Sequence, residues 1–140
     1  MLNGTYRHNI DAKGRMAVPA KFRVDLGDRF YVTRGVSGCL FVFSLEEWER
    51  FNNAIKTSLQ FRESLKLSRH FNALAIEAEP DSQGRIVIPQ ELRAIAGLDH
   101  QAVIIGASNR AEIWNPESWA GESTSITEDD VLDLLEKINF

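Results

Sequence analysis

Two stretches of the chain, IDAKGRMAVPAKFR at residues 10–23 and PDSQGRIVIPQELR at residues 80–93, share one pattern. Their alignment places Asp11 over Asp81, Gly14 over Gly84, Arg15 over Arg85, Pro19 over Pro89 and Arg23 over Arg93. Further along the chain the offset becomes 71, which places Trp48 over Trp119. The sequence therefore contains an internal duplication of a unit of roughly 50 residues.

Composition bounds the kind of protein. A chain of 140 residues with 44% hydrophobic content buries one sizeable core, so we expect one compact body built from two halves. The single cysteine, Cys39, excludes an internal disulfide and a CxxC metal site. There is no apolar run of about 18 residues, and no basic start followed by an apolar stretch. We therefore expect a cytoplasmic protein without a membrane span or signal peptide.

The net charge of −4 is unevenly distributed. Residues 1–34 hold seven Lys or Arg and three acids, a net charge of +4. Residues 111–140 hold eight acids and one Lys, a net charge of −7. This distribution indicates a basic working face and an acidic, solvated end.

Each unit predicts a strand, a turn, a second strand, a short helix and a hairpin. In the first unit RMAVP (15–19) is β-prone, and Pro19 suits the first position of the helix that follows. RFYVT (29–33) and LFVF (40–43) flank a Gly/Ser turn, which is typical of a hairpin. The expected fold class is α+β, mainly β, with the two units forming one pseudo-twofold body in which each supplies strands that the other lacks.

Helices are expected after both hairpins. Ser44 and Glu47 form a capping box before the first helix. Asn115 caps the second, with Trp114 and Trp119 placed as a hydrophobic staple. These tryptophans are at packing positions, so they do not indicate a cofactor site.

Four segments follow from this pattern. We expect a first unit at 1–50, a helical connector at 51–73, a second unit at 74–120 and an acidic C-terminal helix at 121–140. Thr127 is the expected cap of the last helix. Its predicted apolar face consists of Val131, Leu134, Leu135 and Ile138.

The repeated Asp-x-x-Gly-Arg motif predicts a tight turn between two strands. Gly14 and Gly84 can adopt the positive φ that such a turn requires. Asp11 and Asp81 can accept backbone N–H groups across the turn or pair with the arginine four positions on. A purely structural role is an open alternative, especially for the second copy.

The first copy also carries a cluster of positive charge. Arg7, His8, Lys13 and Arg15 surround its turn, and such donors suit a phosphate backbone or guanine edges. In the second copy Gln83 stands where Lys13 stands in the first, so Arg85 has less support.

The paired motifs GTYRHNIDAKGRMAVP and EAEPDSQGRIVIP, each followed by a tryptophan-bearing element, resemble the MraZ family, whose members carry two SpoVT/AbrB-like units. The resemblance covers most of the chain, short of the acidic end. It implies AbrB-like, swapped-hairpin β-barrel units. It also implies a transcription regulator that binds tandem repeats in the promoter of the division and cell-wall gene cluster as a homo-oligomeric ring on the nucleoid.

The resemblance and the charge pattern together select the expected partners and site. Double-stranded DNA and further copies of the chain are the expected partners, with no small-molecule substrate and no membrane. One basic loop gives weak, salt-sensitive binding, so specific affinity requires several protomers on tandem sites. The expected DNA-binding residues are Arg15, Lys13, Arg7 and His8, with Arg85 secondary.

Two other classes of function compete with this one. An enzyme would draw on His8, His70, His100 or Cys39, but these residues lack catalytic or metal-ligand spacing, so we expect no enzyme, cofactor or metal. The other class is a protein-interaction module of the AbrB-like antitoxin type. Such a protein would typically have one unit and a disordered tail, whereas this chain has two units and a helical end.

Overall fold

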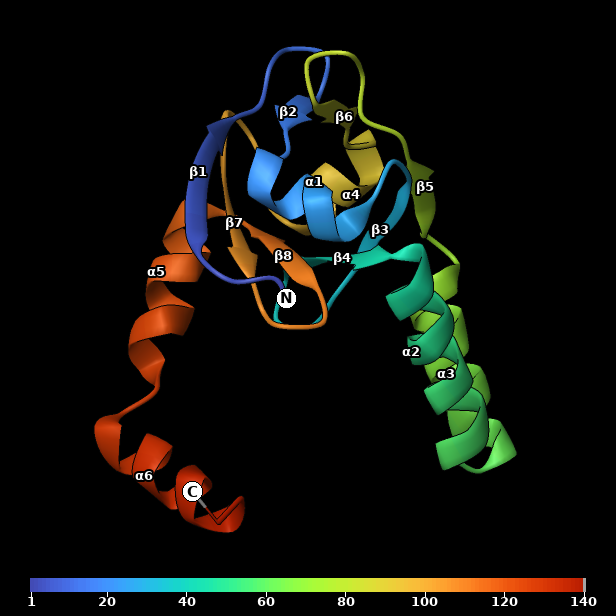
Figure 1. Ribbon diagram of the computed structural model, residues 1–140, viewed down its shortest axis with the longest axis vertical. Helices are drawn as coiled ribbons and strands as arrows, with labels where there is room; N and C mark the ends of the chain where they lie inside the picture. Colours follow the sequence, from blue (N-terminus) through green and yellow to red (C-terminus); the bar gives the residue numbers. More distant parts are fainter. Residues whose placement is uncertain (140) are drawn as a thin grey trace.

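The structure is a computed structural model, and it describes residues 1–139 (Figure 1). The first half contains β1 (Thr5–Asn9), β2 (Arg15–Ala17), α1 (Ala20–Leu26), β3 (Phe30–Arg34), β4 (Leu40–Ser44), α2 (Leu45–Ser58) and α3 (Phe61–Asn72). The second half contains β5 (Ile76–Ala78), β6 (Arg85–Val87), α4 (Gln90–Ile95), β7 (Gln101–Gly106), β8 (Ala111–Trp114), α5 (Pro116–Ser125) and α6 (Glu128–Lys137). The two halves repeat the same order of elements up to the helix after the hairpin.

The strands form a six-stranded antiparallel sheet in the order β1-β7-β8-β4-β3-β5 and a two-stranded sheet of β2 with β6. When each strand is exchanged for its counterpart in the other half, the order reads the same from the opposite edge. The edge strand of each half pairs with the hairpin of the other half, β1 with β7 and β5 with β3. The halves therefore complete each other, as the duplication predicted.

The predicted barrel is wrong in one respect, because the large sheet is not closed. Strands β1 and β5 end it at opposite edges and do not pair with each other. After each edge strand the chain turns away, and β2 and β6 then pair with each other across the open side. The finer expectation of an AbrB-like swapped hairpin stays a prediction.

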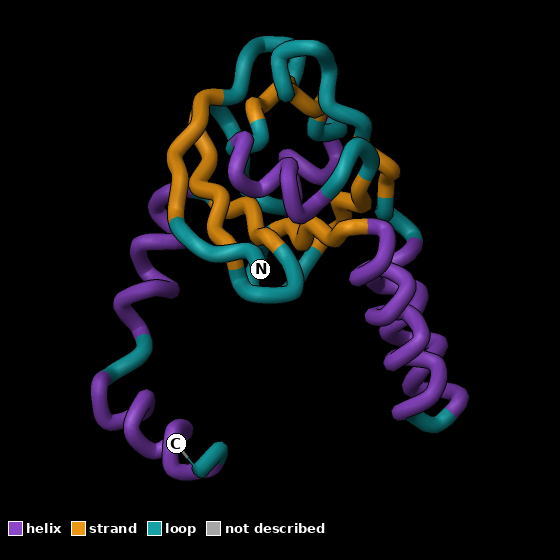
Figure 2. Tube along the Cα trace, in the orientation of Figure 1, coloured by secondary structure: helices purple, strands orange, loops and turns teal. Residues whose placement is uncertain are grey.

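The main core lies between the large sheet and the pair of short helices that it encloses (Figure 2). Its largest fully buried side chains include Met16, Phe22, Phe30, Ile88 and Leu92. They come from both halves, so burying them on folding favours the two halves together. This packing fixes β2 and β6, and with them the turns that precede these strands.

A second, aromatic cluster covers the other face of the sheet beneath α2, α3 and α5. Phe43 lies 5.7 Å from Trp48 between ring centroids, and Trp114 lies 5.5 Å from Trp119. The Ser44 side chain accepts from the N–H of Glu47 at 3.1 Å. Only this half of the expected capping box is present, because the Glu47 carboxylate pairs with Arg50 instead.

Two helix boundaries differ from the sequence prediction. Pro19 and Pro89 have extended ψ values of 135° and 149°, so they precede α1 and α4 as caps instead of starting them. The connector is a helical hairpin of α2 and α3. It breaks at Gln60, whose N–H donates to the Glu63 carboxylate at 3.2 Å.

The C-terminal helix α6 begins as expected. The Thr127 side chain accepts from the N–H of Asp130, and the Asp130 carboxylate accepts from the N–H of Thr127, both at 3.1 Å. Phe140, the last residue of the predicted segment, lies outside the described residues. None of the helices within residues 1–139 has the length and apolar character that crossing a membrane requires.

Candidate nucleic-acid interface

The two Asp-x-x-Gly-Arg turns lie side by side at one end of the molecule (Figure 1). They are brought together by the pairing of β2 with β6, which places Arg15 opposite Val87 and Arg85 opposite Ala17. Gly14 has a φ of 79° and Gly84 a φ of 76°, both in the left-handed region that favours glycine. We call the two turns, residues 11–15 and 81–85, the paired tips.

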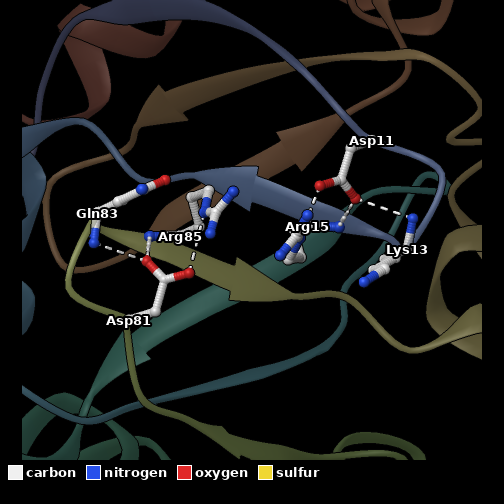
Figure 3. A network of polar contacts seen from close by, with 6 residues as sticks. All are labelled: Asp11, Lys13, Arg15, Asp81, Gln83 and Arg85. Atoms are coloured by element: carbon white, nitrogen blue, oxygen red, sulfur yellow. Dashed lines mark hydrogen bonds and ion pairs between the residues drawn. The ribbon is translucent and has the colours of Figure 1, made fainter.

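Each aspartate holds its tip with three hydrogen bonds. Asp11 Oδ1 accepts from the N–H groups of Lys13 and Arg15, both at 2.9 Å, and Asp11 Oδ2 accepts from Arg15 Nε at 2.6 Å (Figure 3). The turn contacts and the pairing with arginine, which the sequence offered as alternatives, thus occur together.

The second tip repeats this geometry. Asp81 accepts from the N–H groups of Gln83 and Arg85 and from Arg85 Nε, each at 2.9 Å (Figure 3). The backbone N–H of Arg85 is the main cause that lowers the pKa of Asp81, as the N–H of Arg15 lowers the pKa of Asp11. Both carboxylates therefore stay ionised at neutral pH.

The geometry leaves the outer part of each tip arginine available. Within residues 1–139, the side chains of Arg15 and Arg85 bond to protein only through Nε, which leaves the two terminal nitrogens for another partner. The side chains are 32% and 30% exposed. An arginine held at Nε presents two parallel N–H donors, the arrangement that matches a phosphate or a guanine edge.

Two further arginines cross between the halves. Arg23 of α1 donates through Nε to the carbonyl of Val18 at 3.2 Å, and the N–H of Val18 donates to the carbonyl of Gly84 at 2.9 Å. The Arg23 guanidinium lies directly against Gly84, where a Cβ would come within 2.8 Å of its central carbon. An arginine of the first half thus supports the tip of the second.

The reverse crossing is also present. Arg93 of α4 donates through Nε to the carbonyl of Ile88 at 2.9 Å, and the N–H of Ile88 donates to the carbonyl of Gly14 at 2.9 Å. The Arg93 guanidinium lies against Gly14, with both Nε and the central carbon 3.0 Å from where a Cβ would be. Sequence reasoning aligned Arg23 with Arg93 but gave them no role. An arginine at the same place in both copies was the sequence signal that could have indicated a shared role.

The other predicted residues are on β1 instead of the tips. Arg7 faces outward and is exposed. His8 points to the opposite side of the strand and is half-buried, and its Nε2 is buried with no hydrogen-bond partner within residues 1–139. Burial lowers the pKa of His8, so its ring is neutral at pH 7. The structure brings Lys13, Arg15 and Arg85 together and leaves the His8 ring apart from them.

The paired tips and the crossing arginines form one basic surface. It carries the cations Lys13, Arg15, Arg23, Arg85 and Arg93, while Asp11 and Asp81 are taken up in bonds to the tips themselves. No cluster of three or more His, Cys, Asp or Glu suited to a metal ion occurs in the described part of the chain. The chemistry that this surface supports is the binding of anions.

Comparison with known proteins identifies the family of the chain. The family model described as MraZ protein, and further as antitoxin-like, matches residues 1–69 and 71–132. The chain belongs to the MraZ family. It is 44% identical over its whole length to the full-length "Transcriptional regulator MraZ" of Thermoanaerobacter pseudethanolicus. It is 42% identical, again over both full chains, to the protein of the same name from Caldanaerobacter subterraneus subsp. tengcongensis.

Membership of the MraZ family decides between a transcription regulator and an enzyme. Its named members are transcriptional regulators, and the family is not enzymatic, as the sequence predicted. The match in two successive segments also agrees with the duplication of the chain.

Proposed function

We propose that this protein regulates transcription by binding double-stranded promoter DNA through the paired tips. The observation that carries the proposal is the arrangement of Arg15 and Arg85, each fixed by an aspartate at Nε, with terminal nitrogens that have no partner within residues 1–139. Side chains held in place before binding lose little conformational entropy on contact with the DNA.

The chemistry of the tips fits a phosphate backbone with base edges beside it. Arg15 and Arg85 are suited to bidentate contacts with guanine or phosphate, and Lys13 supplies a point charge. Arg7, exposed on β1, would extend the positive surface toward the phosphate backbone of the DNA. His8 stays in the proposal only as a neighbour of this surface, because its ring is turned inward.

A single pair of tips gives limited affinity, because each phosphate contact is weakened by salt. We therefore propose that several copies of the chain bind together, as a homo-oligomeric ring on tandem promoter repeats. Joining the sites raises the effective concentration of each further tip and increases affinity without new contacts. The resemblance to the family points to the division and cell-wall gene cluster as the target.

The test is binding to a fluorescent promoter duplex, measured by anisotropy over a series of salt concentrations. We expect Arg15→Ala to abolish specific binding and Arg85→Ala to weaken it, with the fold and oligomer unchanged. Arg50→Ala is the matched control, because Arg50 is exposed on α2 and outside the basic surface. Equal affinity of the wild type and Arg15→Ala at physiological salt would refute the assignment of the site.

A further inference from the structure

The apolar face of α6 is left largely uncovered by the rest of residues 1–139, with only Leu135 half-buried. Val131 is 43% exposed, Leu134 57% and Ile138 70%, although the four apolar residues of this face have helical spacing. An amphipathic helix in water derives most of its stability from packing of its apolar face. The helix is therefore complete in its capping but lacks a partner surface.

The internal duplication shows what is missing. α2 and α5 occupy equivalent places, each directly after the second strand of a hairpin. In the first half α3 returns alongside α2, and the carbonyl of Phe71 at its end accepts from the Thr33 hydroxyl at 2.6 Å. In the second half α6 instead turns away from α5 and does not return to the sheet (Figure 1). α6 thus follows α5 as α3 follows α2, but without the cover that α3 has.

The helical hairpin of α2 and α3 carries the complementary surface at its free end. Phe61 is 76% exposed and Leu59 37% exposed at the connection between the two helices. Residues 53–69 hold four cations, Lys56, Arg62, Lys66 and Arg69, against the single acid Glu63. All four cations are exposed, and none forms an ion pair within residues 1–139.

The charge of the C-terminal arm is opposite. Residues 116–139 hold seven acids and one Lys, a net charge of −6, against +3 for residues 53–69. The arm formed by α5 and α6 and the hairpin formed by α2 and α3 project from opposite sides of the body (Figure 1). Two complementary surfaces on opposite sides of one molecule suit a contact with a neighbouring copy.

We propose that α6 of one copy packs its apolar face against the free end of the α2–α3 hairpin of the next copy. This inference rests on the homo-oligomer in the proposed function and names the surfaces that build it. The contact is heterologous, because it joins two different surfaces, and repetition of such a contact closes a ring when the rotation permits. Apolar burial stabilises the contact, and the opposite charges favour the encounter of the two copies.

Pairing of α6 with α6 of another copy is the competing arrangement. It would bring together two arms of net charge −6, and like charges brought together disfavour association. The hairpin, by contrast, offers exposed apolar residues within a basic segment. Charge therefore favours the α2–α3 hairpin of a neighbouring copy, over a second α6, as the partner of the apolar face of α6.

The experiment uses the full chain without DNA and measures mass by analytical ultracentrifugation. We expect the wild type to form a closed oligomer and Leu134→Asp and Phe61→Asp to be monomers. Leu132→Asp is the matched control, because Leu132 is 52% exposed on the same helix but about 110° around it from the centre of the apolar face. It should keep the oligomer. Unchanged circular dichroism would show that each variant is folded.

Mixing the two monomeric variants gives the sharpest result. Leu134→Asp retains a working hairpin and Phe61→Asp retains a working α6, so their mixture can form one contact and should produce dimers that grow no further. Two results overturn the inference while leaving a wild-type oligomer intact: Leu134→Asp or Phe61→Asp alone retaining the wild-type mass, or the mixture remaining monomeric. The same holds if Leu132→Asp dissociates as fully as Leu134→Asp.

Failure of the proposed function would give experimental results different from those that overturn the α6 contact alone. A wild type that is monomeric at every concentration overturns the inference together with the ring, whereas the binding of DNA by the tips is measured separately. Copurification of another protein on α6 in place of a second copy would also overturn the inference and would support the antitoxin-type alternative.

Discussion

Arg23 lies against Gly84 although the two residues belong to different halves of the duplication: a Cβ on the glycine would come within 2.8 Å of the guanidinium carbon. Arg93 lies against Gly14 in the same way. The glycines are therefore required for two reasons, the positive φ of the turn and the space that the crossing arginine occupies. This relationship ties the position of each tip to the helix of the other half.

Substitution of the turn glycines separates these two reasons. Gly38→Ala is the control, because Gly38 has a φ of 83° and nothing within 4 Å of a Cβ. We expect it to cost only the strain of the left-handed backbone, about 1–2 kcal/mol of unfolding free energy. Gly84→Ala should cost more, by up to about 1 kcal/mol, because the Arg23 guanidinium must also shift and its bond to the Val18 carbonyl weakens. Urea denaturation measures the difference.

The contact of each arginine with the turn glycine of the other half also predicts which second substitution restores stability to a glycine-to-alanine variant. Adding Arg23→Ala to Gly84→Ala should recover part of the lost stability, since the guanidinium is the nearest group to that Cβ. Adding Arg93→Ala to Gly14→Ala should recover less, because the Ile88 carbonyl oxygen also lies 3.0 Å from that Cβ. Strictly additive effects in both double variants would contradict a crossing contact.

The two tips differ most plainly in Lys13 and Gln83. This difference predicts how the DNA affinity of each tip depends on salt. Lys13→Gln gives the first tip the residue of the second. We expect weaker DNA binding at all sequences, with the slope of log affinity against log salt reduced by about one unit per tip engaged, because one phosphate contact is lost. An unchanged slope would place Lys13 away from the phosphates.

Acid should loosen the tips. Asp11 and Asp81 have pKa values lowered below the usual 3.8, chiefly by backbone N–H donors. Their stabilising contribution is therefore full above about pH 5, where the aspartates of the unfolded chain are also ionised, and is lost as pH falls through the lowered values. Asp11→Asn with Asp81→Asn should be less stable than the wild type at neutral pH, with the gap closing as pH falls through the lowered pKa values. A gap independent of pH, measured by denaturation, would contradict this assignment.

Cys39 should report on unfolding of the protein. It is 1% exposed, and burial raises the pKa of its thiol to about 12, so the reactive thiolate is scarce in the folded state. We expect it to resist a thiol reagent at mildly alkaline pH and to react rapidly in guanidinium chloride. Rapid reaction of the folded protein would show that the aromatic cluster around Cys39 opens readily.

Much of the fold was predictable because it is repeated. Glycine and proline at equal spacing in both copies predicted the turns and the presence of the short helices, although each helix begins one residue after its proline. The caps at Ser44, Asn115 and Thr127 followed from local chemistry. The closed barrel was not correct, because sheet closure depends on which strands meet in space, and the periodicity of one strand does not contain that information.

The candidate site was predictable in part for the same reason. Arg15 and Lys13 were visible as local charge beside a glycine turn. The approach of Arg93 to Gly14 was not, since it depends on helix α4 of one half meeting the turn of the other. The inward direction of His8 was similarly hidden, because a local charge pattern does not show which face of β1 is buried.

The exchange of edge strands between the halves has a further consequence. A homodimer of single units would present two identical tips and could read only a symmetric site. Here both tips belong to one polypeptide, so Lys13 and Gln83 have been free to diverge while β1 and β5 still hold the halves together. The molecule thereby has a direction: if the paired tips bind DNA as proposed, they would distinguish one strand orientation from the other, as successive repeats pointing the same way along a promoter would require.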